Sequence, residues 1–249
     1  MHYIQKRNGM YVLSRNDIEQ IATEQLKQCA PLNLERPMPL NTQHVLENHL
    51  GLLVKYKYIC DIHSGILGLT VMGDQMPIPS YNEQFCPVVL EETFGTVLIT
   101  RELLGNENLP RRRYTEMHEA SHFILHRPYF KCLERSVAAR SEIPCPFVVC
   151  RNVEIERRYQ KTDDDWLEYQ ADALAAAMLM PQSPFTSCVQ DTLRKYGLHA
   201  PYLLITSYSD QKKADCIIYD IAQTFLVSYK AAQIRMKHLG LMRELHYCY

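Results

Sequence analysis

The stretch Tyr114-Thr-Glu-Met-His118-Glu-Ala-Ser-His122-Phe-Ile-Leu125 contains the pattern H-E-x-x-H and is the most informative part of the chain. Residues four apart lie on one face of a helix, so His118 and His122 can reach a single metal ion from the same side. Glu119 then points toward a water activated by that ion, as a general base does. The pattern predicts a zinc hydrolase, although an ordinary surface helix could carry the same five residues.

The residues around the motif favour a helix that is packed in a core. Thr115 is a suitable N-cap, and small or apolar residues flank the histidines. Pro128 is expected to end the helix. His126 would then lie near the C-terminal end, where the helix dipole favours a basic residue.

A catalytic zinc site needs a third protein ligand, with the fourth position left to water. On an unbent helix His126 lies about 12 Å along the axis from His118, which is too far to share one ion. The longer pattern H-E-x-x-H-x-x-G-x-x-H is excluded, because Leu125 and Pro128 occupy its glycine and histidine positions. Glu168 is the remaining candidate.

Glu168 lies in a strongly helical segment, 166–181, which Thr162 can cap and Pro181 closes. Asp172 is four residues further on and shares its face. If Glu168 binds the metal, Asp172 could accept the second ring N–H of a ligand histidine and fix its tautomer. An ordinary acidic helix face would show basic partners at i+4, and none follow here. Two carboxylates in an alanine-rich run need a partner, which a metal site supplies.

Both segments resemble the paired signatures of the ImmA/IrrE metallo-endopeptidases. The first is Thr115-Glu-Met-His-Glu-Ala-Ser-His122, and the second is Glu168-x-x-Ala-Asp172-x-x-Ala-Ala-x-x-Leu-Met-Pro181. The helical stretch from Ile221 to Gly240 is similar to the segment that usually follows. The resemblance covers most of the chain after residue 95.

This resemblance implies an α+β, zincin-like fold with a small mixed sheet in residues 1–181, followed by a small all-helical region in residues 182–249. It implies a gluzincin-type zinc endopeptidase with one Zn²⁺ held by His118, His122 and Glu168. Glu119 would be the catalytic base and Asp172 the acid that supports a ligand histidine. The implied substrate is a helix-turn-helix transcriptional repressor that controls a mobile element or a stress response, and an activating protein could take part.

Composition agrees with a globular cytoplasmic protein. The 249 residues carry a formal net charge of −1, so no overall field would draw the chain to nucleic acid or to an anionic membrane. The nine cysteines are odd in number and contain no C-x-x-C pair, which favours a reducing compartment over a disulfide framework. No apolar run approaches the roughly 20 residues of a membrane span, and Met1–Ser14 lacks the apolar core of a signal peptide.

Cys132, Cys145 and Cys150 lie close together between the two signatures. Thiolates are good zinc ligands, but this spacing matches no structural zinc pattern. Ordinary reduced cysteines are therefore the first interpretation, with an accessory metal site as the alternative.

Local patterns predict the elements before the motif. Asn16 with Glu19 caps a helix over 16–29, and a short helix at 42–50 ends at Gly51. Strands are expected at 54–58 and 66–72, which could form a hairpin, and at Thr96–Thr100. By analogy with related sites, this last strand would bind an extended peptide substrate along its edge.

The connecting segments are predicted to be less regular. Residues 106–113, with Pro110 and three arginines, indicate a loop whose charges are either solvated or bind an acidic partner. From Pro128 to Asp165 we expect a rim or lid with a strand at 147–150 and a polar helix at 153–160.

After Pro181 the pattern indicates helices at 183–196, 217–226 and 228–239. Ser228 would cap the last one, which makes a helix-turn-helix possible. A packing or regulatory role is favoured, and direct DNA binding is not expected. Two alternatives to proteolysis stay open: a zinc-containing protein that sequesters a repressor without cutting it, and a DNA-binding regulator that would use Lys230 and Arg235.

Overall fold

The computed structural model describes residues 3–59, 65–73, 76–138, 147–151 and 162–244. The chain forms two compact units. The first consists of Met1–Ile18 with Thr42–Ala175, and the second of Glu19–Asn41 with Ala176–Tyr249. The predicted domain boundary between residues 181 and 182 lies close to the boundary between the two units, which falls after Ala175. The sequence did not indicate that residues 19–41 belong with the C-terminal part.

The first unit contains a mixed sheet with the strand order β4-β3-β1-β5-β2-β6. β1 and β5 are parallel, and the other neighbours are antiparallel. This confirms the prediction of an α+β fold with a mixed sheet. The strands are β1 (Leu53–Ile59), β2 (Ile66–Val71), β3 (Met76–Tyr81), β4 (Pro87–Glu92), β5 (Thr96–Thr100) and β6 (Phe147–Arg151).

Two predictions about these strands are wrong. β1 and β2 are not a hairpin, because β5 lies between them and pairs with both. For the same reason Thr96–Thr100 is an inner strand, and all five of its residues are buried. Its backbone groups are already paired on both sides, so it cannot accept an added peptide strand. The predicted strand at 147–150 is confirmed as β6, which ends the sheet.

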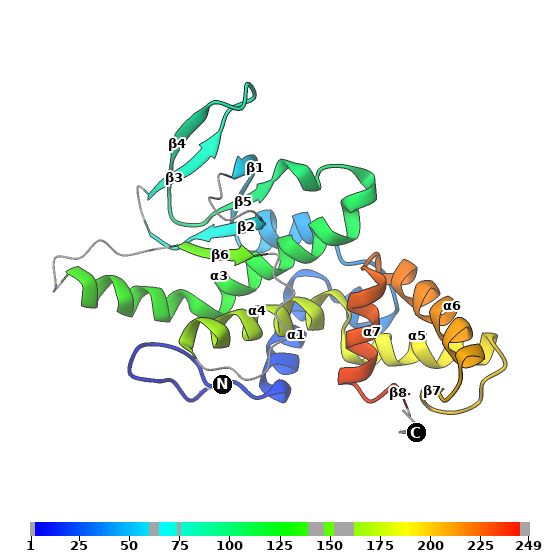
Figure 1. Ribbon diagram of the computed structural model, residues 1–249. Helices are drawn as coiled ribbons and strands as arrows, with labels where there is room; N and C mark the ends of the chain where they lie inside the picture. Colours follow the sequence, from blue (N-terminus) through cyan, green and yellow to red (C-terminus); the bar gives the residue numbers. More distant parts are fainter. Residues whose placement is uncertain (1–2, 60–64, 74–75, 139–146, 152–161, 245–249) are drawn as a thin grey trace, which may run out of the picture. The chain divides into compact units, whose positions relative to one another are not determined.

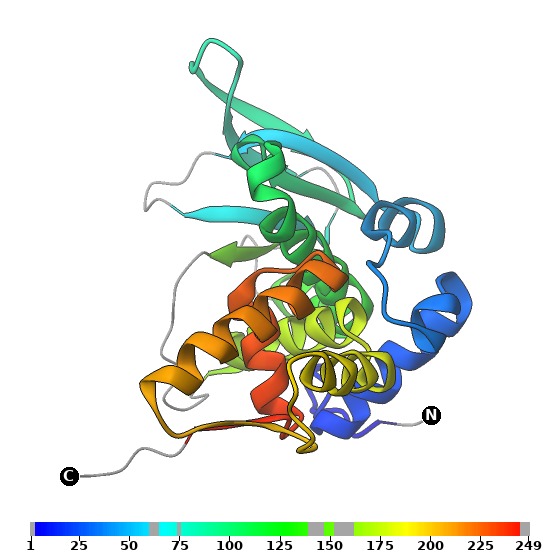
Figure 2. The ribbon, with the colours of Figure 1, turned by 90° about the vertical axis from the view of Figure 1, so that its right-hand side faces the viewer.

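Helix α3 (Leu109–Ala138) carries the H-E-x-x-H motif and runs along the sheet against β2 (Figures 1 and 2). Short turns at Arg101–Leu103 and Asn106–Asn108 precede it. The predicted loop therefore ends earlier than expected, because Pro110 fits the first helical turn, where its missing N–H costs no hydrogen bond. Thr115 lies inside the helix and donates its hydroxyl to the Arg111 carbonyl at 3.0 Å, so its prediction as an N-cap is wrong.

The same helix continues through Pro128, contrary to the predicted end. A proline removes one backbone donor, but Leu125 and Phe130 on either side of it are both buried, and their packing offsets that loss. The N-terminal segment also lies close at this point: a Cβ added to Gly9, which has a φ of +87°, would be 2.5 Å from the Pro128 carbonyl oxygen. His126 is therefore inside the helix, not at its C-terminal end.

Helix α4 (Asp163–Leu179) supplies the second signature and begins with the predicted cap. Thr162 Oγ1 accepts from the Asp165 backbone N–H at 3.1 Å, and Asp165 Oδ2 accepts from the Thr162 N–H at 3.1 Å. These reciprocal bonds satisfy donors that a helix start leaves without a helical acceptor. Figures 1 and 2 both show α3 between the sheet and the first half of α4.

Helix α1 (Arg15–Cys29) agrees with the predicted helix, but its cap is different. Ser14 Oγ accepts from the Asp17 N–H at 3.2 Å, and Asp17 Oδ2 accepts from the Ser14 N–H at 2.7 Å. The pair expected to cap the helix was Asn16 with Glu19. The predicted short helix at 42–50 is present as a π-helical turn over His44–His49.

The second unit is mainly helical, and its helices α5, α6 and α7 pack on one another in sequence order (Figure 2). The predicted all-helical C-terminal region is incorrect in one respect, because β7 and β8 pair in parallel. Helix α6 also begins well before the predicted Ile217. The elements are α2 (Leu32–Glu35), α5 (Gln182–Lys195), β7 (Leu203–Ile205), α6 (Tyr208–Phe225), α7 (Tyr229–His238) and β8 (Met242–Glu244).

Helices α6 and α7 are joined by a tight turn. Leu226 adopts the left-handed conformation with a φ of 50°, and Ser228 caps α7 by accepting from the Ala231 N–H at 3.1 Å. Arg235, which the DNA-binding alternative required, is buried and donates to the Met180 carbonyl at 3.0 Å and to Glu19 Oε2 at 2.9 Å. An arginine engaged in this way is not available to nucleic acid.

Three further predictions concern membranes and the segment between the signatures. In the part of the chain that the structure describes, no helix is both long and apolar enough to cross a bilayer. The predicted helix at 153–160 lies outside the described residues. Cys145 does too, so the structure does not describe the three-cysteine cluster. Cys132 is a free thiol.

Candidate metal centre

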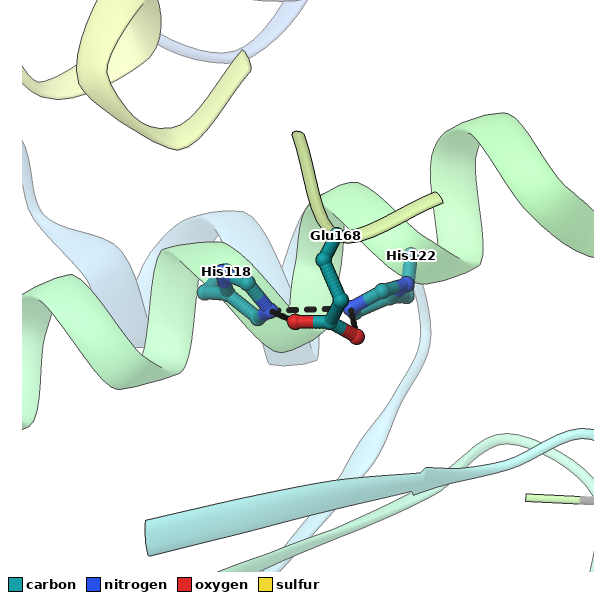
Figure 3. Close-up of side chains that lie close together, drawn as sticks. All are labelled: His118, His122 and Glu168. Carbon is teal, nitrogen blue, oxygen red and sulfur yellow. Dashed lines mark hydrogen bonds and ion pairs between the residues drawn. The ribbon is translucent and has the colours of Figure 1, made fainter. Parts of the chain in front are cut away.

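Two turns of α3 and one turn of α4 bring three potential metal ligands together. Figure 3 shows His118 and His122 on one helix, with Glu168 reaching between them from the other. The two Nε2 atoms are 2.8 Å apart, and each lies 3.3 Å from one oxygen of the Glu168 carboxylate. These residues form the single cluster of metal-binding side chains found among the described residues.

The histidines are not part of an ordinary surface helix. His118 is 2% exposed and His122 is 0% exposed. Polar rings are buried at a cost unless they have partners. The Glu168 side chain remains 26% exposed, so the cluster is accessible from the side of α4.

Asp172 sets the orientation of the His118 ring. Its Oδ1 lies 2.8 Å from His118 Nδ1, and a carboxylate accepts a hydrogen bond. In the neutral ring the proton is therefore on Nδ1, and the Nε2 lone pair faces Glu168. A carboxylate and an imidazole lone pair directed at the same point repel each other unless a proton or a cation lies between them. The donor set thus fits a bound metal ion.

The protonation states also suit metal binding. Burial lowers the pKa of His122, although the neighbouring Glu168 acts in the opposite direction. Burial raises the pKa of Glu168, but the two neighbouring rings of His118 and His122 outweigh it and bring that pKa well below its ordinary value. At neutral pH the His122 ring is then neutral and Glu168 is ionised, the forms in which these side chains bind metals.

His126 extends the same row of histidines by one more turn. Its Nδ1 lies 2.9 Å from His122 Nδ1, and its Nε2 lies 3.1 Å from Oε1 of Gln170 on α4. The ring is fully buried, and burial lowers the pKa of His126 well below its ordinary value. His126 contacts the site through His122 and is not a member of the ligand cluster.

Glu119, next to His118 in the chain, is held against the sheet. Thr70 on β2 donates its hydroxyl to Glu119 Oε2 at 2.7 Å, and both residues are fully buried. A Cβ added to Gly68 on the same strand would lie 3.0 Å from Glu119 Cγ and 2.9 Å from Thr115 Cγ2. The glycine therefore leaves the space that the glutamate side chain uses.

Three tyrosines on α3 and α4 near this centre have contacts of their own. The Tyr114 hydroxyl lies 3.3 Å from the Asp172 carbonyl oxygen, and the Tyr169 hydroxyl accepts from Arg15 Nε at 3.4 Å. The Tyr129 ring packs edge-on against Phe130.

Sequence reasoning missed three residues around this centre and placed a fourth, His126, at a helix end instead of behind His122. His126 lies four residues after His122, so its helical spacing could have indicated a contact with that ring. Gln170, Thr70 and Gly68 had no comparable local signal, because their partners lie on other elements. A scan of protein-family models and a search of curated proteins find no match to this chain.

Proposed function

We propose that this protein is a zinc-dependent endopeptidase. This proposal rests on one observation: the side chains of His118, His122 and Glu168 meet in a single cluster of potential metal ligands. Three protein ligands are typical of catalytic zinc sites, whereas structural sites use four. Two histidines and one glutamate are a known ligand set of catalytic zinc in hydrolases.

Each residue then has a definite role. His118, His122 and Glu168 would hold a zinc ion, which would supply Lewis acidity toward a peptide carbonyl and would lower the pKa of bound water to about 7. Glu119 accepts a proton from the water that attacks the carbonyl carbon, and returns it to the amine nitrogen as the C–N bond breaks. Thr70 holds Glu119 through its hydroxyl at 2.7 Å, and Asp172 orients His118.

Among the described residues, β6 is the terminal strand of the sheet on the side of the motif helix, and it contacts α3. An extended peptide can pair with a terminal strand through main-chain hydrogen bonds. We therefore assign substrate pairing to β6 in place of the inner strand β5.

The nature of the substrate follows from the resemblance of the two signatures to ImmA/IrrE enzymes. It is a helix-turn-helix repressor in the cytoplasm, and an activating protein could control its cleavage. A small repressor encoded beside this gene would be the first protein to test.

The direct test is to incubate the zinc-loaded protein with a proteome-derived peptide library and to detect new N-termini by mass spectrometry. Glu119→Gln is the matched variant, because glutamine keeps the shape and removes the base. The wild type should produce new termini, and Glu119→Gln should bind equal zinc and produce none. Cleavage by Glu119→Gln at the wild-type rate would disprove the mechanism.

A second candidate is a protein that binds a repressor without cutting it. It is favoured by the contact of Tyr114 with Asp172, because that hydroxyl already donates to the Asp172 carbonyl oxygen. Co-purification of the intact neighbouring repressor with the wild type, without product, would support this function.

A further inference from the structure

The hydrogen bonds behind His122 have a defined direction that starts at a backbone carbonyl. The carbonyl oxygen of Tyr11 lies 2.7 Å from one terminal atom of the Gln170 amide. A carbonyl oxygen can only accept, so that atom is the amide nitrogen. The amide oxygen of Gln170 therefore faces His126 Nε2, at 3.1 Å.

The orientation of the Gln170 amide determines which nitrogen of His126 is the donor and which is the acceptor. Because Gln170 Oε1 can only accept, His126 Nε2 carries the proton and donates it. A neutral imidazole has one donor and one acceptor nitrogen, so His126 Nδ1 is the acceptor. His122 Nδ1, 2.9 Å away, must then be the donor. This leaves the lone pair of His122 on Nε2, which is directed at His118 and Glu168.

The two ligand histidines are thus oriented by different chemistry. His118 donates to the carboxylate of Asp172, whose side chain is 35% exposed. His122 is fully buried, and a second carboxylate at the position of His126 would carry a large desolvation cost. A neutral histidine accepts the same hydrogen bond without burying a charge.

We infer that His126 and Gln170 are positioning residues that fix the tautomer of His122, and that the Tyr11 carbonyl sets the direction of this hydrogen-bond chain. The inference rests on the metal site of the proposed function. This assignment makes the N-terminal segment that contains Tyr11 part of the support of the metal centre. The Tyr11 carbonyl also accepts a hydrogen bond from the Trp166 indole, at 3.3 Å.

Zinc affinity tests this assignment without any substrate. Removing the partner of a ligand histidine typically weakens metal binding about 10- to 100-fold. His126→Phe keeps a flat ring and removes the acceptor, so we expect a loss in that range from competition with a chelator. His126→Asn should recover most of the affinity, because its side-chain oxygen can take the place of Nδ1. Gln170→Met should fall between the wild type and His126→Phe.

A matched control and a folding check accompany these variants. His199 is exposed and lies in the other unit, so His199→Phe should leave zinc affinity unchanged. Far-UV circular dichroism and urea unfolding identify any variant that fails to fold. Equal zinc affinity of folded His126→Phe and the wild type would overturn the inference.

The tautomers can be read directly from long-range ¹H–¹⁵N spectra of the zinc-loaded protein with ¹⁵N-labelled histidine. We expect protons on Nε2 of His126 and on Nδ1 of His122. The reverse arrangement on His126 would overturn the inference and leave the protease proposal intact. The expected tautomers without cleavage of any peptide would support the inference and count against the protease, whereas a wild type that binds no zinc would overturn both.

Discussion

The contact between Thr70 and Glu119 allows a quantitative prediction. Thr70→Val keeps the shape of the side chain and removes the hydroxyl that donates to Glu119 Oε2 at 2.7 Å. Both residues are fully buried, so no bulk water can replace the lost donor. A hydrogen bond to a charged group contributes about 1.5–3 kcal/mol, or about 10- to 150-fold in an equilibrium or a rate.

Urea unfolding of the metal-free protein measures the first part of this effect. The free energy of unfolding should fall by about 1.5–3 kcal/mol in Thr70→Val. Thr70→Ser keeps the hydroxyl and should lose only about 0.8 kcal/mol for the missing methyl group. If Glu119 must be held for proton transfer, the cleavage rate of a substrate peptide should fall by a similar factor in Thr70→Val alone.

A double-mutant cycle that combines Thr70→Val with Glu119→Gln then measures the interaction energy between these two side chains. Because a bond to a neutral amide contributes about 0.5–1.5 kcal/mol, Thr70→Val should cost about 1 kcal/mol less in the Glu119→Gln background. Equal stability of Thr70→Val and Thr70→Ser, together with no coupling in the cycle, would refute the reasoning.

Three further predictions concern the same centre. Gly68→Ala should lower the free energy of unfolding by about 1–3 kcal/mol and reduce cleavage, since the added methyl group overlaps Glu119; an unchanged urea midpoint would contradict this. The pKa values of His122 and His126 are lowered below 6.5 on folding, so the unfolded chain binds more protons just below that pH. The free energy of unfolding of the metal-free protein should therefore decrease as the pH falls from 7.5 to 5, by up to about 1.4 kcal/mol per pH unit for each histidine, and a flat profile would argue against it. Glu168→Gln should lose most of its bound zinc in mass-spectrometric metal analysis, whereas a remaining full equivalent would point to a second site that includes Cys132.

Local spacing determined much of the first unit in advance. The i and i+4 positions of His118 and His122 placed both rings on one helix face, and the capping residue Thr162 and the run after it predicted the partner helix with Glu168. These features depend on residues within a few turns of one another. The sequence alone could therefore indicate which side chains would be available as ligands.

Only the tertiary structure decided how these elements are supported. Strand partners come from distant parts of the chain, so alternation could not show that β5 separates β1 from β2. The packing on either side of Pro128 keeps α3 continuous, which places His126 behind His122 instead of at a helix end. Thr70 and Gln170 contact their partners across 49 and 44 residues of chain, respectively. Contacts of this kind depend on how the elements pack, and no local pattern in the sequence encodes them.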